Sequence, residues 1–158
     1  SLDVPARPAV PTATSPPDWA RVLDDLDTAR AAAFADADDH ALSSADAPGS
    51  PAMVRDLATV RALAARGVQA EGFRITVLSV QPLFVGPQGA VLDVTDRRAG
   101  YDLVDATGTV VSSQPARSTA RWRVELVRSQ AGWRVRDVRS ASPLPTAGPG
   151  APTGTRPP

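Results

Sequence analysis

The spacing of apolar residues changes once along this chain, near Phe73, and that change limits the folds open to it. Before Phe73, apolar residues return every three or four positions, as on one face of a helix; after it they alternate, as in half-buried strands. The later segments are joined by short connections, which favour antiparallel neighbours. A sheet with one apolar face needs helices to cover it. The pattern predicts an α+β domain in which two N-terminal helices pack on a four-stranded antiparallel sheet.

The first predicted helix begins near Trp19, directly after two prolines. Either Ser15 or Asp18 could accept the free amide hydrogens of its first turn. Its predicted inner stripe consists of Trp19, Val22, Leu23, Leu26, Ala29, Ala33 and Ala37.

The second predicted helix has clear signals at both ends. Ser50 suits the N-cap, Pro51 suits the first helical position, and Gly67 suits the left-handed conformation that ends many helices. Its predicted inner stripe consists of Val54, Leu57, Val60 or Arg61, and Ala64.

Four strands are predicted after the helices, over residues 73–84, 91–104, 109–128 with a break at Gln114-Pro115, and 133–140. Counting outward from the turns places Leu92 opposite Trp122, Leu126 opposite Val135 and Val124 opposite Asp137. The predicted inner face carries Leu92, Val94, Asp96, Trp122, Val124, Leu126, Trp133, Val135 and Asp137. The predicted outer face is polar and includes an Asp93–Arg121 ion pair. Two carboxylates, Asp96 and Asp137, therefore fall on the apolar face.

The two ends of the chain differ in composition from its middle. Eleven of the 16 prolines lie in residues 1–17 or 143–158. We therefore expect a Pro-rich linker at 1–17, one domain at 18–142 and a disordered Pro/Gly-rich tail at 143–158. Since the chain begins with Ser1 rather than Met, we expect a signal or membrane anchor to precede it, and an extracytoplasmic location, either secreted or near a membrane.

Charge and composition exclude several function classes. The 17 basic and 17 acidic residues balance, which disfavours nucleic acid as a partner. The chain has no cysteine and only one histidine, so the common metal sites are excluded and we expect no metal and no cofactor. No phosphate-binding loop, dinucleotide fingerprint or nucleophile elbow is present. The charge is nevertheless split, because residues 18–56 are strongly acidic and residues 117–139 strongly basic.

Three local features together resemble a known family. They are Asp18-Trp19 at the first helix, Gly49-Ser50-Pro51-Ala52 before the second, and Gly132-Trp133-Arg134-Val135 in the last strand. Over residues 18–139 the chain resembles the SnoaL-like branch of the nuclear transport factor 2-like superfamily, and in particular uncharacterised actinobacterial domains that often follow a signal or membrane anchor. The resemblance implies a cystatin-like, cone-shaped fold with a curved sheet. The mouth of the cone is a ligand pocket in the enzymes and is filled in many other members.

The superfamily's enzymes use aspartate, tyrosine or histidine inside the cone, so the resemblance implies four candidate catalytic residues. Asp96 and Asp137 lie on the predicted inner face, where burial can raise a carboxyl pKa toward neutrality for acid-base chemistry. Tyr101 could polarise a carbonyl group, and His40 could act as a base. Each has a structural alternative: a bulge that turns Asp96 outward, an arginine partner for Asp137, a core position for Tyr101 and a surface loop for His40.

We favour a non-enzymatic extracytoplasmic domain that binds a protein partner or a second copy of itself, as a homodimer through the sheet. In that case Trp19, Phe34 and Trp122 should plug the cone. The alternatives are a small-molecule isomerase, dehydratase or cyclase, and a carrier of an apolar ligand. An open pocket walled by both Tyr101 and an aspartate would favour the enzyme.

Overall fold

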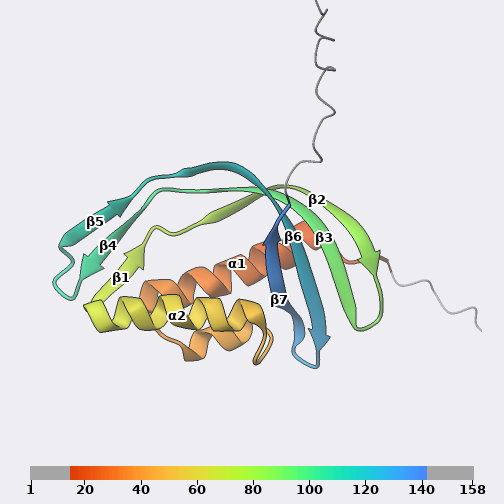
Figure 1. The fold of residues 1–158 in the computed structure, drawn as a ribbon, viewed down its shortest axis with the longest axis horizontal. Helices are drawn as coiled ribbons and strands as arrows, with labels where there is room; N and C mark the ends of the chain where they lie inside the picture. Colours follow the sequence, from red (N-terminus) through yellow and green to blue (C-terminus); the bar gives the residue numbers. More distant parts are fainter. Residues whose placement is uncertain (1–14, 142–158) are drawn as a thin grey trace, which may run out of the picture.

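The computed structural model describes residues 15–141, so most of the predicted linker and tail lies outside the described residues. Two helices and a short 3-10 turn come first, followed by strands only (Figure 1). The elements are α1 (Trp19–Asp36), η1 (His40–Ser44), α2 (Pro51–Arg66), β1 (Val68–Glu71), β2 (Ile75–Val85), β3 (Gly89–Arg98), β4 (Tyr101–Asp105), β5 (Val110–Gln114), β6 (Arg117–Ser129) and β7 (Gly132–Ser140). The predicted α+β class is confirmed.

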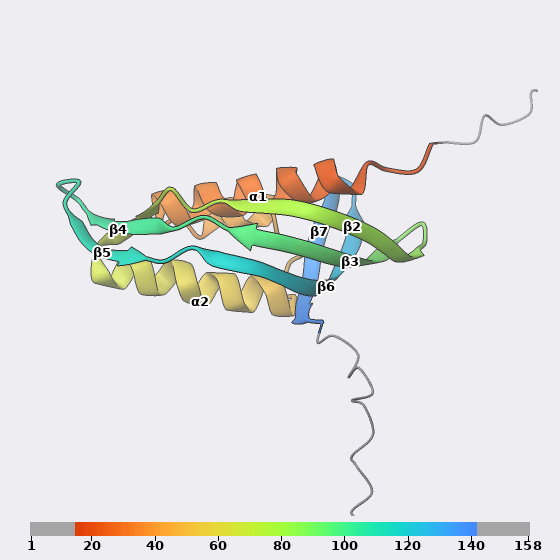
Figure 2. The ribbon, with the colours of Figure 1, turned by 90° about the horizontal axis from the view of Figure 1, so that it is seen from above.

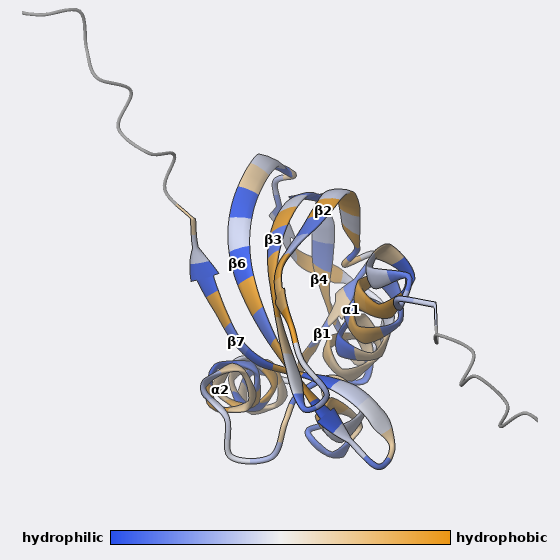
Figure 3. Cartoon of the chain, turned by 90° about the vertical axis from the view of Figure 1, so that its right-hand side faces the viewer, coloured by the Kyte–Doolittle hydropathy of each residue, from blue (hydrophilic) through white to orange (hydrophobic). Residues whose placement is uncertain are grey.

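The strands form two antiparallel sheets rather than one. One sheet has the order β2-β3-β6-β7 and the other has the order β1-β4-β5. The strands arch over α1 and α2, which lie on the same side of them (Figures 1 and 2). Apolar and polar residues alternate along β6, as expected of a strand with one covered face (Figure 3). None of the helices in the described part is long and apolar enough to cross a membrane.

The prediction of four strands is wrong, because seven are described. The segment expected as one strand over 91–104 divides at Gly100 into β3 and β4. A Cβ atom at Gly100 would lie 3.2 Å from the Gln114 carbonyl oxygen and 3.3 Å from the Ala116 amide nitrogen. Without a side chain at Gly100, the backbone around Gln114 and Ala116 can come close to it. This is the point where the long hairpin passes from one sheet to the other. The short strand β1, which pairs with β4, was missed.

The helix ends follow the local signals. Ser50 Oγ accepts a hydrogen bond from the Met53 amide at 3.2 Å, and Gly67 ends α2 with a φ of 64°. Of the two possible caps of α1, Asp18 accepts from the Arg21 amide. The predicted inner stripe of α2 is correct at Val60 and at Leu57, which is partly buried and packs against the second core cluster, and wrong at Val54, which is 62% exposed, and at Ala64. The buried residues of the helix are Ala52, Asp56, Val60 and Leu63. The helix is turned so that a carboxylate faces inward.

The predicted pairings were correct near one turn and shifted elsewhere. Leu126 lies opposite Val135 as expected. Val124 lies opposite Val138 and not Asp137, because a register shift leaves Arg136 as an extra residue in β7. Leu92 lies opposite Val124 and not Trp122. Because this second error is an even number of residues, the predicted faces of β3 and β6 are correct and the Asp93–Arg121 ion pair is confirmed. The one-residue shift in β7 instead pairs Asp137 with Glu125, a residue of the predicted outer face.

Two apolar clusters hold the helices to the strands. The first joins the start of α1 to the four-stranded sheet through Trp19, Leu23, Leu26, Ala90, Leu92, Val94, Val124 and Leu126. The second joins the end of α1 to η1, α2 and the smaller sheet through Ala33, Phe34, Leu42, Val60, Leu63, Val68, Ala70 and Leu103. Trp19 and Phe34 are therefore core residues.

Candidate functional site

A cavity of about 400 Å³ lies between the helices and the four-stranded sheet. This volume is in the usual range for small-molecule sites. Its apolar wall includes Leu26, Ile75, Val77, Val94 and Trp122. Its charged wall consists of four aspartates and four arginines, Asp27, Asp46, Asp56, Asp96, Arg30, Arg55, Arg98 and Arg117. An enclosed surface with so many charged groups needs each of them to have a partner.

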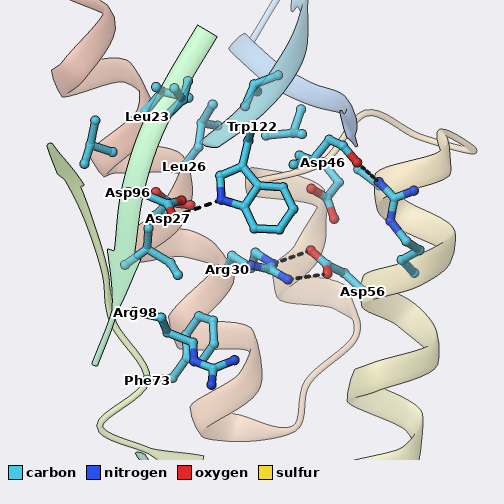
Figure 4. A pocket seen from close by; sticks show the side chains of 18 of the residues that line it. Leu23, Leu26, Asp27, Arg30, Asp46, Asp56, Phe73, Asp96, Arg98 and Trp122 are labelled. Atoms are coloured by element: carbon cyan, nitrogen blue, oxygen red, sulfur yellow. Dashed lines mark hydrogen bonds and ion pairs between the residues drawn. The ribbon is translucent and has the colours of Figure 1, made fainter. Parts of the chain in front are cut away.

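Trp122 stands in the middle of this cavity with its indole edge bonded to Asp96 (Figure 4). The indole Nε1 donates to Asp96 Oδ1 at 2.9 Å, and Arg117 Nη2 donates to the same oxygen at 2.7 Å. The Arg117 guanidinium also lies 5.3 Å from the indole centroid, a cation–π distance. The expectation that Trp122 plugs the fold is therefore wrong, since it lines an open volume.

Arg30 and Asp56 form a two-bonded ion pair across the cavity, from α1 to α2 (Figure 4). Arg30 Nε and Nη2 donate to the two carboxylate oxygens at 2.7 and 2.9 Å. The guanidinium also lies 4.9 Å from the Phe34 ring centroid and 5.6 Å from that of Phe73. This pair ties the two helices together and explains why α2 turns Asp56 inward.

Asp46 enters the cavity from the loop between η1 and α2. The loop is fastened to β7 by two backbone hydrogen bonds, from the Ala47 amide to the Val135 carbonyl and from the Val135 amide to the Ala45 carbonyl. Between these bonds Asp46 is only 1% exposed, and its Oδ2 has no hydrogen-bond partner. Burial, and then the nearby Asp56 charge, raise the pKa of Asp46 to about 7.

Asp27 reaches the cavity from α1, close to Asp96 (Figure 4). Burial raises its pKa to about 7, against the opposing effect of Arg30 and with a further contribution from Asp96. At neutral pH, Asp27 and Asp46 are therefore each able to give up or accept a proton.

The four predicted candidates lie in different places. Asp96 lines the cavity, and Tyr101 contacts its edge, with its ring 5.3 Å from Phe73 and 5.2 Å from the Arg98 guanidinium. Asp137 is buried outside the cavity, between α2 and β7. His40 lies in η1 with its side chain 96% exposed. The structure does not bring the four together.

Asp137 is fully engaged by basic partners. Arg55 Nη2 and Arg139 Nε each donate to one of its oxygens at 2.8 Å, and the Val138 amide donates at 2.9 Å. These bonds lower its pKa to about 2. Its geometry matches the structural alternative, an aspartate that pairs with neighbouring arginines.

Sequence reasoning missed the residues that carry most of the cavity's charge. Asp27 and Arg30 are three residues apart on α1, beside Leu23 and Leu26, so the helical period could have placed them on the inner side. Asp46 has no such signal, because it sits in an irregular loop. Within residues 15–141, no group of three or more acidic or histidine side chains is arranged to hold a metal ion.

The chain matches no protein-family model, and no curated protein matches it in sequence. Solved structures do resemble it. The intermembrane-space region of the chloroplast protein ARC6 is 16% identical, with a TM-score of 0.57 over 81% of this chain and 100% of that one. At this identity, the similarity shows a shared fold.

Two further structures are more distant. A protein with a cystatin-like fold from Caulobacter vibrioides is 15% identical, with a TM-score of 0.43 over 78% of this chain and 89% of that one. A protein from the NTF2-like (nuclear transport factor 2-like) family of Streptomyces avermitilis is 16% identical, with a TM-score of 0.46 over 81% of this chain and 99% of that one.

Proposed function

We propose that this domain binds a small organic molecule in the cavity between its helices and its four-stranded sheet. One observation carries the proposal. The cavity of about 400 Å³ combines an apolar wall with charged groups, and among residues 15–141 one of these, Arg98, has no carboxylate partner. A concave, largely apolar surface with a few polar groups is the usual form of a small-molecule site.

The cavity supports both small-molecule alternatives raised by the sequence. A carrier needs only the enclosed volume and its apolar wall. An isomerase, dehydratase or cyclase also needs a group that exchanges a proton near neutral pH, and Asp27 and Asp46 have that property. Asp96 is the candidate that lies beside Asp27 (Figure 4). Of the four expected candidates, Asp96 is therefore the one retained in this proposal.

Filling the cavity tests the proposal. Ala52 lines it, whereas Ala58 lies on the exposed side of the same helix. We expect the fluorescence of 1-anilinonaphthalene-8-sulfonate (ANS), a dye with an apolar body and one negative charge, to rise saturably with the unmodified protein and with Ala58→Leu. The response should be lost with Ala52→Leu, and circular dichroism should show that each variant is folded.

Equal dye binding by Ala52→Leu and Ala58→Leu would contradict the proposal. If Ala52→Leu does not fold, Val77→Phe fills the cavity from β2 and repeats the test.

A second function is favoured by a different surface. Leu83, Phe84 and Val85 are 49%, 62% and 49% exposed at the end of β2, which is an edge strand. Exposed apolar clusters of this kind mark interaction sites. We retain the hypothesis of an extracytoplasmic interaction domain for this surface. The proposed compartment rests on the sequence resemblance, in which similar domains follow a signal or membrane anchor.

A measurement of self-association tests this second function independently of ligand binding in the cavity. We expect Phe84→Ser to reduce self-association measured by sedimentation velocity, and Val54→Ser to leave it unchanged, since both side chains are 62% exposed. A protein that stays monomeric over the whole concentration range would exclude a second copy as the partner.

A further inference from the structure

Arg98 differs from the other arginines of the cavity in its partners. The other three are paired with carboxylates, as Arg30–Asp56, Arg55–Asp137 and Arg117–Asp96. Among residues 15–141, no carboxylate lies within salt-bridge distance of Arg98. One positive charge on the cavity wall is therefore left without a local counter-ion.

The Arg98 guanidinium is nevertheless held in a fixed place. Its Nη2 donates to the Pro115 carbonyl at 3.0 Å, and its Cζ lies 5.2 Å from the centroid of the Tyr101 ring. Its Nε is buried and has no acceptor. A planar guanidinium held in this way is suited to a carboxylate, which can accept parallel hydrogen bonds from it.

The chain places Arg98 here through strand alternation. Asp96 and Arg98 are two residues apart on β3, so both side chains point to the cavity, while Arg97 between them is exposed. A register shift between Asp96 and Arg98 gives β6 an extra residue at this point, so that Arg98 lies opposite Arg117. Since Arg117 is paired with Asp96, Arg98 is the cation that remains for a ligand.

Asp46 lies away from Arg98, with the Arg30 side chain between them in Figure 4. We propose that the cavity takes an organic monocarboxylate, with its carboxylate on Arg98 and its apolar body against the apolar wall that includes Trp122. This inference rests on the proposed function. A single negative charge fits best, because the other three arginines of the wall are already paired with carboxylates and only Arg98 is left to hold an anionic group.

Two small molecules of the same shape, one charged and one neutral, test this inference. The probes are 4-phenylbutyrate and its neutral amide, 4-phenylbutanamide, titrated into the folded chain by calorimetry. We expect the unmodified protein to bind the carboxylate roughly tenfold or more tightly than the amide, as a charge-assisted hydrogen bond implies. Arg98→Gln should lose this preference, and Arg97→Gln, on the exposed side of the same strand, should keep it.

The outcomes separate the two proposals. If both probes bind equally to the unmodified protein and to Arg98→Gln, the role of Arg98 is overturned while the cavity remains a binding site. If ANS binds but neither probe does, the monocarboxylate assignment is also overturned. If nothing binds, ANS included, the proposed function itself fails. Should Arg98→Gln not fold, Arg98→Lys keeps the charge without the planar fork and should weaken the preference.

Discussion

Two buried aspartates lie close together at strand β7 and have opposite environments. Asp137 belongs to β7, and Asp46 bridges to Val135 of that strand from the loop before α2. Asp137 accepts hydrogen bonds from two guanidinium groups and a backbone amide, and its pKa falls to about 2. Asp46 has an oxygen without a partner, and its pKa rises to about 7.

The difference distinguishes a structural ion pair, at Asp137, from a candidate ligand-binding position, at Asp46. At Asp137, the partners compensate the cost of burying the charge, so the ionised carboxylate fastens α2 to β7. At Asp46, burial and the neighbouring Asp56 charge oppose ionisation, and a hydrogen bond to Asp56 favours the protonated acid. Asp46 is therefore a group that exchanges a proton near neutral pH on the wall of the cavity.

The largest expected effect comes from removing the ion pair beside Asp46. We expect Asp56→Ala to lower the free energy of unfolding by about 3 kcal/mol, because it leaves Arg30 unpaired near the cavity. This is the lower end of the range for a broken buried pair, since a third of the Arg30 side chain reaches solvent. Urea denaturation measures the loss. Asp39→Ala is the control, because Asp39 lies 3.9 Å from an exposed Arg61, and a loss equal to that control would contradict the role of the pair.

A smaller effect is expected at Asp137, with a defined pH window. Asp137→Asn should cost about 1–2 kcal/mol at pH 7, because a neutral amide accepts weaker hydrogen bonds from Arg55 and Arg139. The pKa of Asp137 is lowered from 3.8 to about 2, so the stabilisation is present above the unfolded value and is lost as pH falls through the folded value. The difference between the two proteins should shrink below about pH 4. A pH-independent difference would mean that the charge of Asp137 is not what matters.

The corresponding substitution at Asp46, Asp46→Asn, should stabilise the protein where Asp137→Asn destabilises it. Its folded pKa of about 7 exceeds the ordinary 3.8, so the folded state holds the extra proton and the protein loses stability as pH rises from about 4 to 7. Asp46→Asn should therefore raise the free energy of unfolding at pH 8 and leave it unchanged at pH 4. Thermal unfolding at both pH values measures this. A destabilising effect at pH 8 would show that the Asp46 charge has a partner.

The sequence was informative where the signals are local. Ser50, Pro51 and Gly67 predicted both ends of α2 because caps depend on neighbouring residues alone. The burial of Asp46 depends instead on backbone bonds to the distant Val135, and the division at Gly100 depends on the approach of β5. Neither leaves a periodic pattern in the sequence.

The candidate site was harder to predict than the fold for the same reason. Asp96 was found because strand alternation placed it on the inner face. Asp56 was missed because an inward carboxylate contradicts the apolar stripe used to orient α2. Only the Arg30 partner, on another helix, makes that orientation stable.

The smallest expected effect distinguishes the two arginines that hold Asp137. Arg139 lies opposite Arg123 on the neighbouring strand, and like charges in direct register repel. Its side chain is also 72% exposed, so its bond to Asp137 competes with water. We expect Arg139→Ala to leave the free energy of unfolding nearly unchanged, since the lost bond and the relieved repulsion offset each other. Arg55→Ala should cost more, because Arg55 also donates to the Val138 carbonyl and joins α2 to the sheet. Urea denaturation of the two variants side by side gives the comparison. If Arg139→Ala costs as much as Arg55→Ala, the arginine on Asp137's own strand stabilises the ionised carboxylate as much as the one on the helix that crosses it.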